Sequence, residues 1–128
     1  MLKKYFFALV LLLSFTVVAQ AQKIVQVTST EASKLLTKDN KWIVLDVRTP
    51  DEFKDGHIKN AINIDINSDE AFQKIEKLNK NAKYIVHCRT NHRSGKAVAY
   101  MNTHGFKTIY QMSDGFSGWS SGNNAVVK

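Results

Sequence analysis

The chain has 128 residues, of which 44% are apolar and 23% charged, and its formal net charge is +7 at pH 7. This length accommodates one domain with its own hydrophobic core, but not two. The 18 lysine and arginine residues are spread along the sequence without a cluster, which argues against a nucleic-acid-binding surface.

The first 21 residues have the pattern of a secretory signal peptide. Lys3 and Lys4 precede an apolar run over residues 5–18, and Ala19-Gln20-Ala21 supplies the small residues that a signal peptidase requires. The run is shorter than the roughly 20 apolar residues that span a membrane, which makes an uncleaved anchor the weaker alternative. We therefore expect cleavage after Ala21, a single mature domain over residues 22–128, and an exported, periplasmic protein without membrane association. Cleavage removes two lysines and lowers the net charge from +7 to +5.

The first part of the mature chain alternates strand-like and helix-like segments. Residues 24–27 predict a strand, and Ser29 or Thr30 is expected to cap a short helix over residues 31–36. The continuous apolar run 42–45 is typical of a strand buried on both faces. Pro50, preceded by Thr49 as a cap, predicts a short helix through residue 53.

Two further elements are expected before the middle of the chain. The alternation of apolar residues over 61–66 predicts a strand. Ser68 is expected to cap a helix in which Ala71, Phe72, Ile75 and Leu78 recur at helical spacing.

The second half repeats the alternation of strand and helix. Residues 84–86 predict a buried strand, 88–92 a polar loop, 94–104 a helix ended by Gly105, and 108–110 a last strand. A glycine-marked segment follows over residues 115–119. Strands that alternate with helices predict an α/β fold, here a mostly parallel five-stranded sheet with helices on both faces.

Cys88 is the only cysteine. In an exported protein a single cysteine forms a disulfide between chains, remains a free reactive thiol, or is an inert core residue. In parallel sheets, ligands bind beyond the carboxyl ends of the strands, and Cys88 directly follows a strand that the pattern places centrally. Its position therefore favours chemistry over packing.

The loop after this strand is suited to holding a negative charge. A short loop that leads from a strand into a helix turns several backbone N–H groups inward, and the helix adds its unpaired N–H groups and its dipole. Cys88 stands at the start of this loop, with Arg89 and Arg93 close in sequence. These features stabilise a thiolate, and they would equally stabilise a persulfide anion. Asn91 lies in mid-loop, where we expect a left-handed backbone.

Three segments resemble the rhodanese-like sulfurtransferases. Residues 88–94, Cys-Arg-Thr-Asn-His-Arg-Ser, resemble the active loop of that family, with Asn91 in the place of its usual glycine. Residues 45–64 resemble its N-terminal signature, with Lys59-Asn60 in the place of Pro-Gly, and residues 114–119 resemble its C-terminal signature. The three matches occur in order and extend from residue 42 to residue 119. The chain is thus similar to small, single-domain, exported thiosulfate sulfurtransferases.

The resemblance implies a sulfur transfer in two displacements. Cys88 is the expected nucleophile: its thiolate takes the outer sulfur of a small anionic donor such as thiosulfate, and a thiol or cyanide acceptor then removes it. The expected substrate-binding residues are those of the rest of the loop: Arg89, Thr90, Asn91, His92, Arg93 and Ser94. Residues 90–93 are expected to act chiefly through their backbone N–H groups. No cofactor, metal or nucleic acid is expected, and because there is no second cysteine the acceptor must come from outside the chain.

The charged residues near the loop allow several interpretations. Arg89 either contacts anionic substrate or lies solvated at the surface. Arg93 either faces the pocket or pairs with a carboxylate such as Asp46. We expect Arg48 to pair with Glu52.

The remaining polar and aromatic residues of these segments are interpreted as structural. Ser94 is expected to cap the junction of loop and helix, and His57 to be a hydrogen-bonded structural residue. His87 is expected to point away from Cys88 and not to act as a base. We expect Phe116 and Trp119 to pack beneath the loop.

Two other functions compete with sulfur transfer. The cell-cycle protein phosphatases resemble the same fold, but their loop has five residues between cysteine and arginine, whereas four separate Cys88 from Arg93. The non-enzymatic alternative is a sulfur-carrier or binding module with slow turnover. The oligomeric state does not follow from the sequence.

Overall fold

The computed structural model describes residue 14 and residues 23–128. The predicted signal peptide, residues 1–21, therefore lies outside the described residues apart from residue 14. Among the described residues, no helix has both the length and the apolar character required to cross a bilayer.

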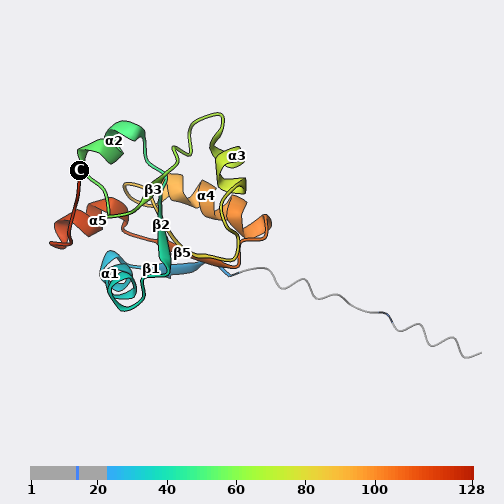
Figure 1. Ribbon diagram of the computed structural model, residues 1–128, viewed down its shortest axis with the longest axis horizontal. Coiled ribbons are helices and arrows are strands. Elements are labelled where there is room, and N and C mark those ends of the chain that lie inside the picture. The colour runs from blue at the N-terminus through green and yellow to red at the C-terminus, as the bar shows by residue number, and fades with distance from the viewer. Residues whose placement is uncertain (1–13, 15–22) are drawn as a thin grey trace, which may run out of the picture.

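A five-stranded, fully parallel sheet forms the centre of the fold (Figure 1). Its strands, in spatial order, are β1 (Val25–Val27), β5 (Thr108–Met112), β4 (Lys83–His87), β2 (Trp42–Asp46) and β3 (Ile62–Asn63). The sheet predicted from the sequence is confirmed. The crossover helices between parallel strands cover both faces, which explains why β2 and β4 are nearly continuous in apolar residues.

Five helices accompany the sheet, with α3 and α4 on one side and α1 and α5 on the other (Figure 1). They are α1 (Ser29–Lys38), α2 (Pro50–Asp55), α3 (Ala71–Glu76), α4 (His92–Thr103) and α5 (Gly115–Ser121). Each face encloses its own group of buried apolar side chains. Cys88 belongs to the group beneath α3 and α4.

The helix caps agree only partly with the sequence predictions. Thr49 caps α2 in a complete capping box with Glu52, as expected. In α1 the cap is Thr28, which forms a capping box with Glu31, so the assignment to Ser29 or Thr30 was wrong. Ser68 does not cap α3, because its hydroxyl donates to the Asp65 carbonyl.

The strand predicted over residues 61–66 is much shorter than expected. Only Ile62 and Asn63 pair with β2, and Ile64 and Ile66 continue as irregular chain with their amides bonded to Asp46 and Val47. Just before this strand, Asn60 has a φ of 65°. Asparagine tolerates this left-handed conformation better than most residues other than glycine do.

A candidate active-site loop at the carboxyl edge of the sheet

The register of β2 and β4 brings the candidate residues together. Asp46 pairs with His87 at the carboxyl edge of the sheet, and the Val47 amide donates to the His87 carbonyl. Cys88 is the next residue, and α4 begins only four positions later at His92. The loop therefore leaves a central strand and enters a helix within Cys88–Asn91, as the sequence predicted.

The carbonyls of this loop are held by neighbouring elements. The Cys88 carbonyl accepts from the Phe116 amide at 2.8 Å, and the Arg89 carbonyl accepts from the Ser117 amide at 3.0 Å. The C=O of a trans peptide and the N–H that follows it point in opposite directions. The amides of Arg89 and Thr90 are thereby turned away from α5.

The amides of the loop and of the first turn of α4 are available to a ligand. Within the described part of the chain, the N–H groups of residues 89–94 donate to no backbone or side-chain acceptor. Successive unpaired amides at the start of a helix attract a negative group. The cradle predicted for a negatively charged sulfur requires unpaired amides of this kind.

Cys88 is more deeply buried than a position at the mouth of a crevice suggests. It is 1% exposed and packs in the core beneath α3 and α4, while Arg89, Thr90, Asn91 and His92 are exposed above it. An inert core cysteine would also be buried. The set of unpaired amides that immediately follows Cys88 is a feature that an inert core cysteine does not require.

Arg93 pairs with Glu52 and not with Asp46. Its guanidinium donates to both carboxylate oxygens, at 2.6 and 3.0 Å, and both side chains are 21% exposed. The hydrogen bond with Glu52 is the main cause that raises the pKa of Arg93. The donors of the Arg93 guanidinium are thus directed at Glu52.

Arg48 pairs with Asp46, so the predicted Arg48–Glu52 pair was wrong. The Arg48 side chain donates to Asp46 at 2.7 Å and to the Gly56 carbonyl at 2.7 Å, and both charged residues are buried. The guanidinium also lies 3.9 Å from the centre of the Phe116 ring. Asp46 and Arg48 are thus a buried brace at the end of β2.

The other predicted loop residues differ in what they offer a substrate. The Arg89 side chain is 68% exposed, with its Nε 3.6 Å from Glu52. Thr90 and His92 are exposed. Asn91 has a φ of −146°, so the left-handed conformation expected for it was wrong. Ser94 is buried inside the first turn of α4, where its hydroxyl donates to the Asn91 carbonyl and accepts from Gln111, so its expected role as a cap was wrong.

Both histidines interpreted as structural are held by backbone contacts. His57 stacks on Phe53, and its Nδ1 lies 2.8 Å from the Phe53 carbonyl. His87 is fully buried, with Nδ1 3.0 Å from the Cys88 carbonyl and Nε2 without a partner. Burial lowers the pKa of His87, which keeps the ring neutral although Asp46 lies 3.6 Å away. The ring of His87 faces Phe116, on the side of the sheet opposite to the Cys88 side chain.

The roles of three residues at the site were not predicted. Gln111 donates from β5 to the Asn91 carbonyl and to Ser94, and Glu52 holds Arg93. Asp114 accepts from the backbone and hydroxyl of Ser29 and so fastens the start of α5 to α1. Of these, only Glu52 had a usable sequence signal, the spacing of a capping box with Thr49.

The Glu52–Arg93 pair is expected to make stability depend on acid pH. The hydrogen bond from Arg93 is the main cause that lowers the pKa of Glu52 from 4.5 to about 2. The folded state therefore binds this proton less readily than the unfolded state, so the pair stabilises the fold above pH 4.5 and loses this contribution as pH falls towards 2. At ~1.4 kcal/mol per pKa unit the full shift corresponds to about 3.5 kcal/mol, which screening by solvent reduces to about 2–3 kcal/mol.

The measurement is urea unfolding of the wild type and of Glu52→Gln at a series of acid pH values. We expect the variant to be less stable at neutral pH and to lose less stability on acidification. Glu70→Gln is the matched control, because Glu70 is 69% exposed in its pair with Lys74. Equal pH slopes for wild type and Glu52→Gln would contradict the assignment.

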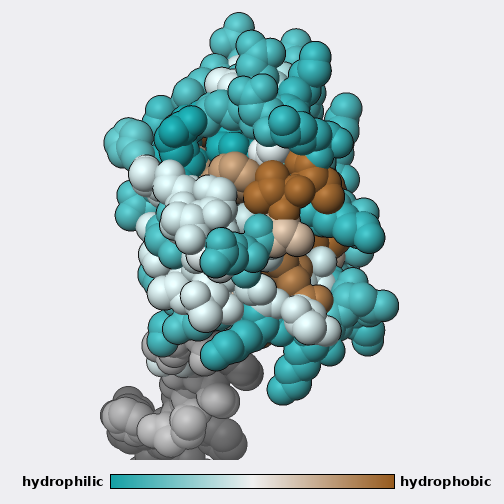
Figure 2. All heavy atoms as spheres, turned by 90° about the vertical axis from the view of Figure 1, so that its left-hand side faces the viewer, coloured by the Kyte–Doolittle hydropathy of each residue, from teal (hydrophilic) through white to brown (hydrophobic). Residues whose placement is uncertain are grey.

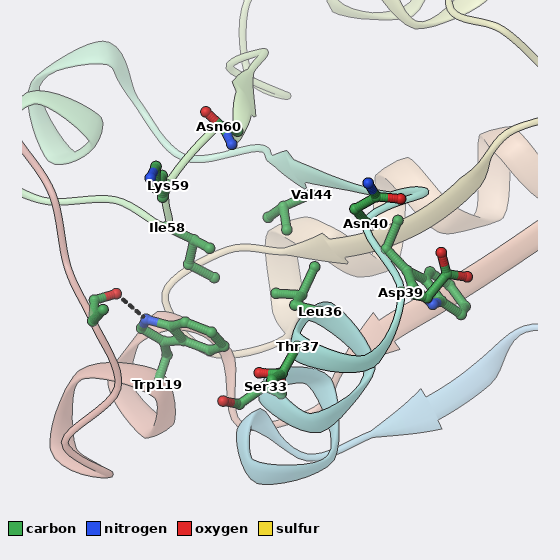
Figure 3. Close-up of a pocket in the computed structure, with 12 residues that line it drawn as sticks. Ser33, Leu36, Thr37, Asp39, Asn40, Val44, Ile58, Lys59, Asn60 and Trp119 are labelled. Carbon is green, nitrogen blue, oxygen red and sulfur yellow. Dashed lines mark hydrogen bonds between the residues drawn. The ribbon is translucent and has the colours of Figure 1, made fainter.

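Among the described residues, a cavity of about 460 Å³ lies beside α1, and two smaller cavities lie on the same side of the sheet, opposite to the Cys88 side chain. The smaller, of about 210 Å³, adjoins the loop and is lined by Arg48, Glu52, Asp55, Gly56, Arg89, Phe116, Ser117 and Ser120. The larger, of about 360 Å³, includes Leu36, Val44, Ile58 and Trp119, and the Trp119 indole donates to the Ala125 carbonyl (Figure 3). Apolar side chains gather on this face between hydrophilic borders (Figure 2). Trp119 is therefore a packing residue as expected, but it lies along α5 and away from the loop.

Comparison with known proteins agrees with this fold. The family model described as the rhodanese-like domain matches residues 28–122. The crystal structure of a rhodanese-related protein from Thermoplasma volcanium superposes with a TM-score of 0.71 at 29% identity, over 80% of this chain and 97% of that one.

Two curated relatives illustrate the range of proteins that contain such a domain. A mitochondrial protein of Schizosaccharomyces pombe, provisionally named a thiosulfate sulfurtransferase, is 32% identical over 99 residues, which cover 69% of this chain and 70% of that protein. The tRNA uridine(34) hydroxylase of Buchnera aphidicola is also 32% identical over 99 residues, which cover 74% of this chain. The chain spans only 30% of the length of that hydroxylase.

Proposed function

The chain belongs to the rhodanese-like domain family, and from this premise we propose that it is a sulfurtransferase in which Cys88 carries the transferred sulfur. The observation that carries the proposal is the run of unpaired amides at residues 89–94 directly after the only cysteine. Amides fixed by the fold stabilise developing negative charge without having to reorganise. The relative provisionally named a thiosulfate sulfurtransferase supports the same class of reaction.

The proposed reaction consists of two displacements at sulfur. The Cys88 thiolate attacks the outer sulfur of thiosulfate, the S–S bond of the donor breaks, and sulfite leaves with the electron pair. The product is a persulfide anion on Cys88. A cyanide ion or an acceptor thiolate then attacks the terminal sulfur, and the Cys88 thiolate leaves, which regenerates the enzyme.

The loop residues contribute to this reaction in different ways. The amides of residues 89–94 receive the terminal sulfur anion, and Arg93 adds positive charge from its position beside Glu52. Arg89 is the exposed cation that attracts an anionic donor. Ser94 has its hydroxyl engaged by Asn91 and Gln111, so it acts through the shape of the loop.

The pairing of Arg93 argues against a phosphatase. A phosphate group needs an arginine whose donors face into the loop, because bidentate bonds to its oxygens stabilise the transferred group. Both terminal nitrogens of Arg93 instead donate to Glu52. We therefore retain sulfur transfer as the proposed activity.

The test is turnover of the mature protein with thiosulfate and cyanide, measured as thiocyanate released, alongside an aryl phosphate as a phosphatase substrate. We expect thiocyanate and no phosphate. Release of phosphate without thiocyanate would overturn the proposal. Formation of the persulfide without multiple turnovers would instead identify a sulfur carrier.

We also propose that residues 1–21 direct the protein out of the cytoplasm and are then removed. The support is the basic, apolar and Ala-Gln-Ala pattern of the sequence. N-terminal sequencing of the protein recovered from a periplasmic extract is expected to start at Gln22. Recovery of the chain from the cytoplasmic fraction with its N-terminus intact would contradict the proposal.

A further inference from the structure

The start of α5 touches the loop through its backbone. The amides of Phe116 and Ser117 donate to the carbonyls of Cys88 and Arg89, two successive peptide groups of the loop. The Cys88 carbonyl also lies 3.0 Å from Nδ1 of His87. These bonds determine which way the two peptides face, because reversing either peptide would break them and turn a carbonyl oxygen into the cradle.

Gly115 allows this close approach. A Cβ at this position would lie 2.3 Å from the Thr90 oxygen and 2.5 Å from the Arg89 oxygen, and the φ of Gly115 is 57°. Any other residue would therefore clash with the loop backbone and would also adopt a strained conformation. The adjacent Asp114 is fixed by its two hydrogen bonds to Ser29, so α5 cannot easily withdraw from such a clash.

We propose that Gly115–Ser117 are positioning residues that hold the loop amides towards the sulfur and so set the rate at which Cys88 acquires it. This inference rests on the proposed sulfurtransferase function. None of the three residues touches the reacting atoms. They act through the carbonyls of Cys88, Arg89 and Thr90, whose peptide groups include the first three amides of the cradle.

The direct test compares Gly115→Ala with Gly95→Ala. Gly95 lies in the first turns of α4, close to the same loop, but no atom lies within 4 Å of the position that its Cβ would take. We expect Gly115→Ala to slow sulfur loading from thiosulfate by about 100-fold, the lower end of the loss found when one preorganised donor is removed. Gly95→Ala is expected to load at the wild-type rate.

A second measurement distinguishes an effect on the orientation of the loop amides from a general loss of packing. Gly115→Ala is expected to have a smaller fraction of Cys88 as thiolate at neutral pH, seen as lower ultraviolet thiolate absorbance, although its far-ultraviolet circular dichroism is that of a folded protein. Loss of packing alone would lower the melting temperature without changing the thiolate signal of the folded state.

Ser117→Pro removes one of the hydrogen bonds to the loop without adding a side chain at Gly115. Proline lacks the N–H that bonds to the Arg89 carbonyl, and it is tolerated in the first turn of a helix. We expect a smaller loss of loading rate than in Gly115→Ala, in the same direction. This variant decides the matter if Gly115→Ala does not fold.

The outcomes distinguish the inference from the function on which it rests. Loading of folded Gly115→Ala or Ser117→Pro at the wild-type rate, with an unchanged thiolate signal, would overturn the positioning role and leave the proposed function intact. Failure of the wild type itself to acquire sulfur would overturn the function. Slower loading and reduced thiolate signal in both variants, with Gly95→Ala unaffected, would support the inference.

Discussion

Cys88→Ser is expected to lose all detectable sulfur transfer. A serine hydroxyl forms no persulfide, and no other cysteine exists to replace Cys88. The thiocyanate assay should fall to the rate of the uncatalysed reaction, not to a reduced enzymatic rate. Cys88→Ala is a useful companion, because it removes the sulfur without placing a hydroxyl in the core beneath α3 and α4.

The stability of these two variants shows whether activity is lost because the thiol is absent or because the protein is unfolded. Cys88 is buried, so an unsatisfied serine hydroxyl costs about 1–3 kcal/mol, whereas alanine leaves only a small cavity. Thermal unfolding should show that both are folded at the assay temperature. Thiocyanate release by either folded variant at a rate near the wild type would exclude Cys88 as the sulfur-carrying residue.

Arg48→Met is expected to cause the largest loss of stability of the substitutions considered. Asp46 is fully buried, and Arg48 provides its charge partner and all of its side-chain hydrogen bonds. Removing one partner of a buried ion pair typically costs about 3–5 kcal/mol, because the other charge is left uncompensated. Methionine retains most of the apolar stem, so the loss measures the charge and its hydrogen bonds.

Urea unfolding at neutral pH is the measurement for Arg48→Met, with Lys74→Met as the matched control. Lys74 pairs with Glu70 at 3.7 Å, and both side chains are more than half exposed, so its loss should cost less than about 1 kcal/mol. Equal losses of stability in the two variants would show that the buried Asp46–Arg48 pair stabilises the fold no more than an exposed pair does.

The fold could be predicted from the sequence largely because the strands are strongly patterned. The apolar runs of β2 and β4 are typical of strands that are covered on both faces. The helical patterns between successive strands indicate that the strands pair in parallel. The length of β3 was overestimated because Ile64 and Ile66 alternate like strand residues. They are buried in irregular chain, because their amides donate to the carbonyls of Asp46 and Val47 without forming a continuous strand ladder.

The ion pairs could not be predicted because they depend on how separate elements meet. Arg48 and Glu52 are four residues apart, which would suit a pair within one helix, but Arg48 precedes α2 and extends back along β2 to Asp46. Glu52 therefore pairs with Arg93, which is 41 positions away in the sequence. Nothing in the spacing of these residues indicates that the first turns of α2 and α4 face each other.

The seven-residue helix α5 was missed for a similar reason. Its sequence, Gly-Phe-Ser-Gly-Trp-Ser-Ser, has low helix propensity, and nothing in it predicts a regular element. The helix forms because Asp114 is held by Ser29 and because Phe116 and Trp119 are packed. The contacts that α5 makes with the loop could therefore not be predicted from the sequence either.

The most direct measurement is the mass of Cys88 after exposure to thiosulfate. The protein, freed of thiosulfate, is digested, and the peptide that contains Cys88 is weighed before and after addition of cyanide. We expect this peptide alone to gain the mass of one sulfur atom and to lose it to cyanide. A peptide of unchanged mass, in a protein that is folded and has its thiol reduced, would contradict a sulfur-carrying Cys88.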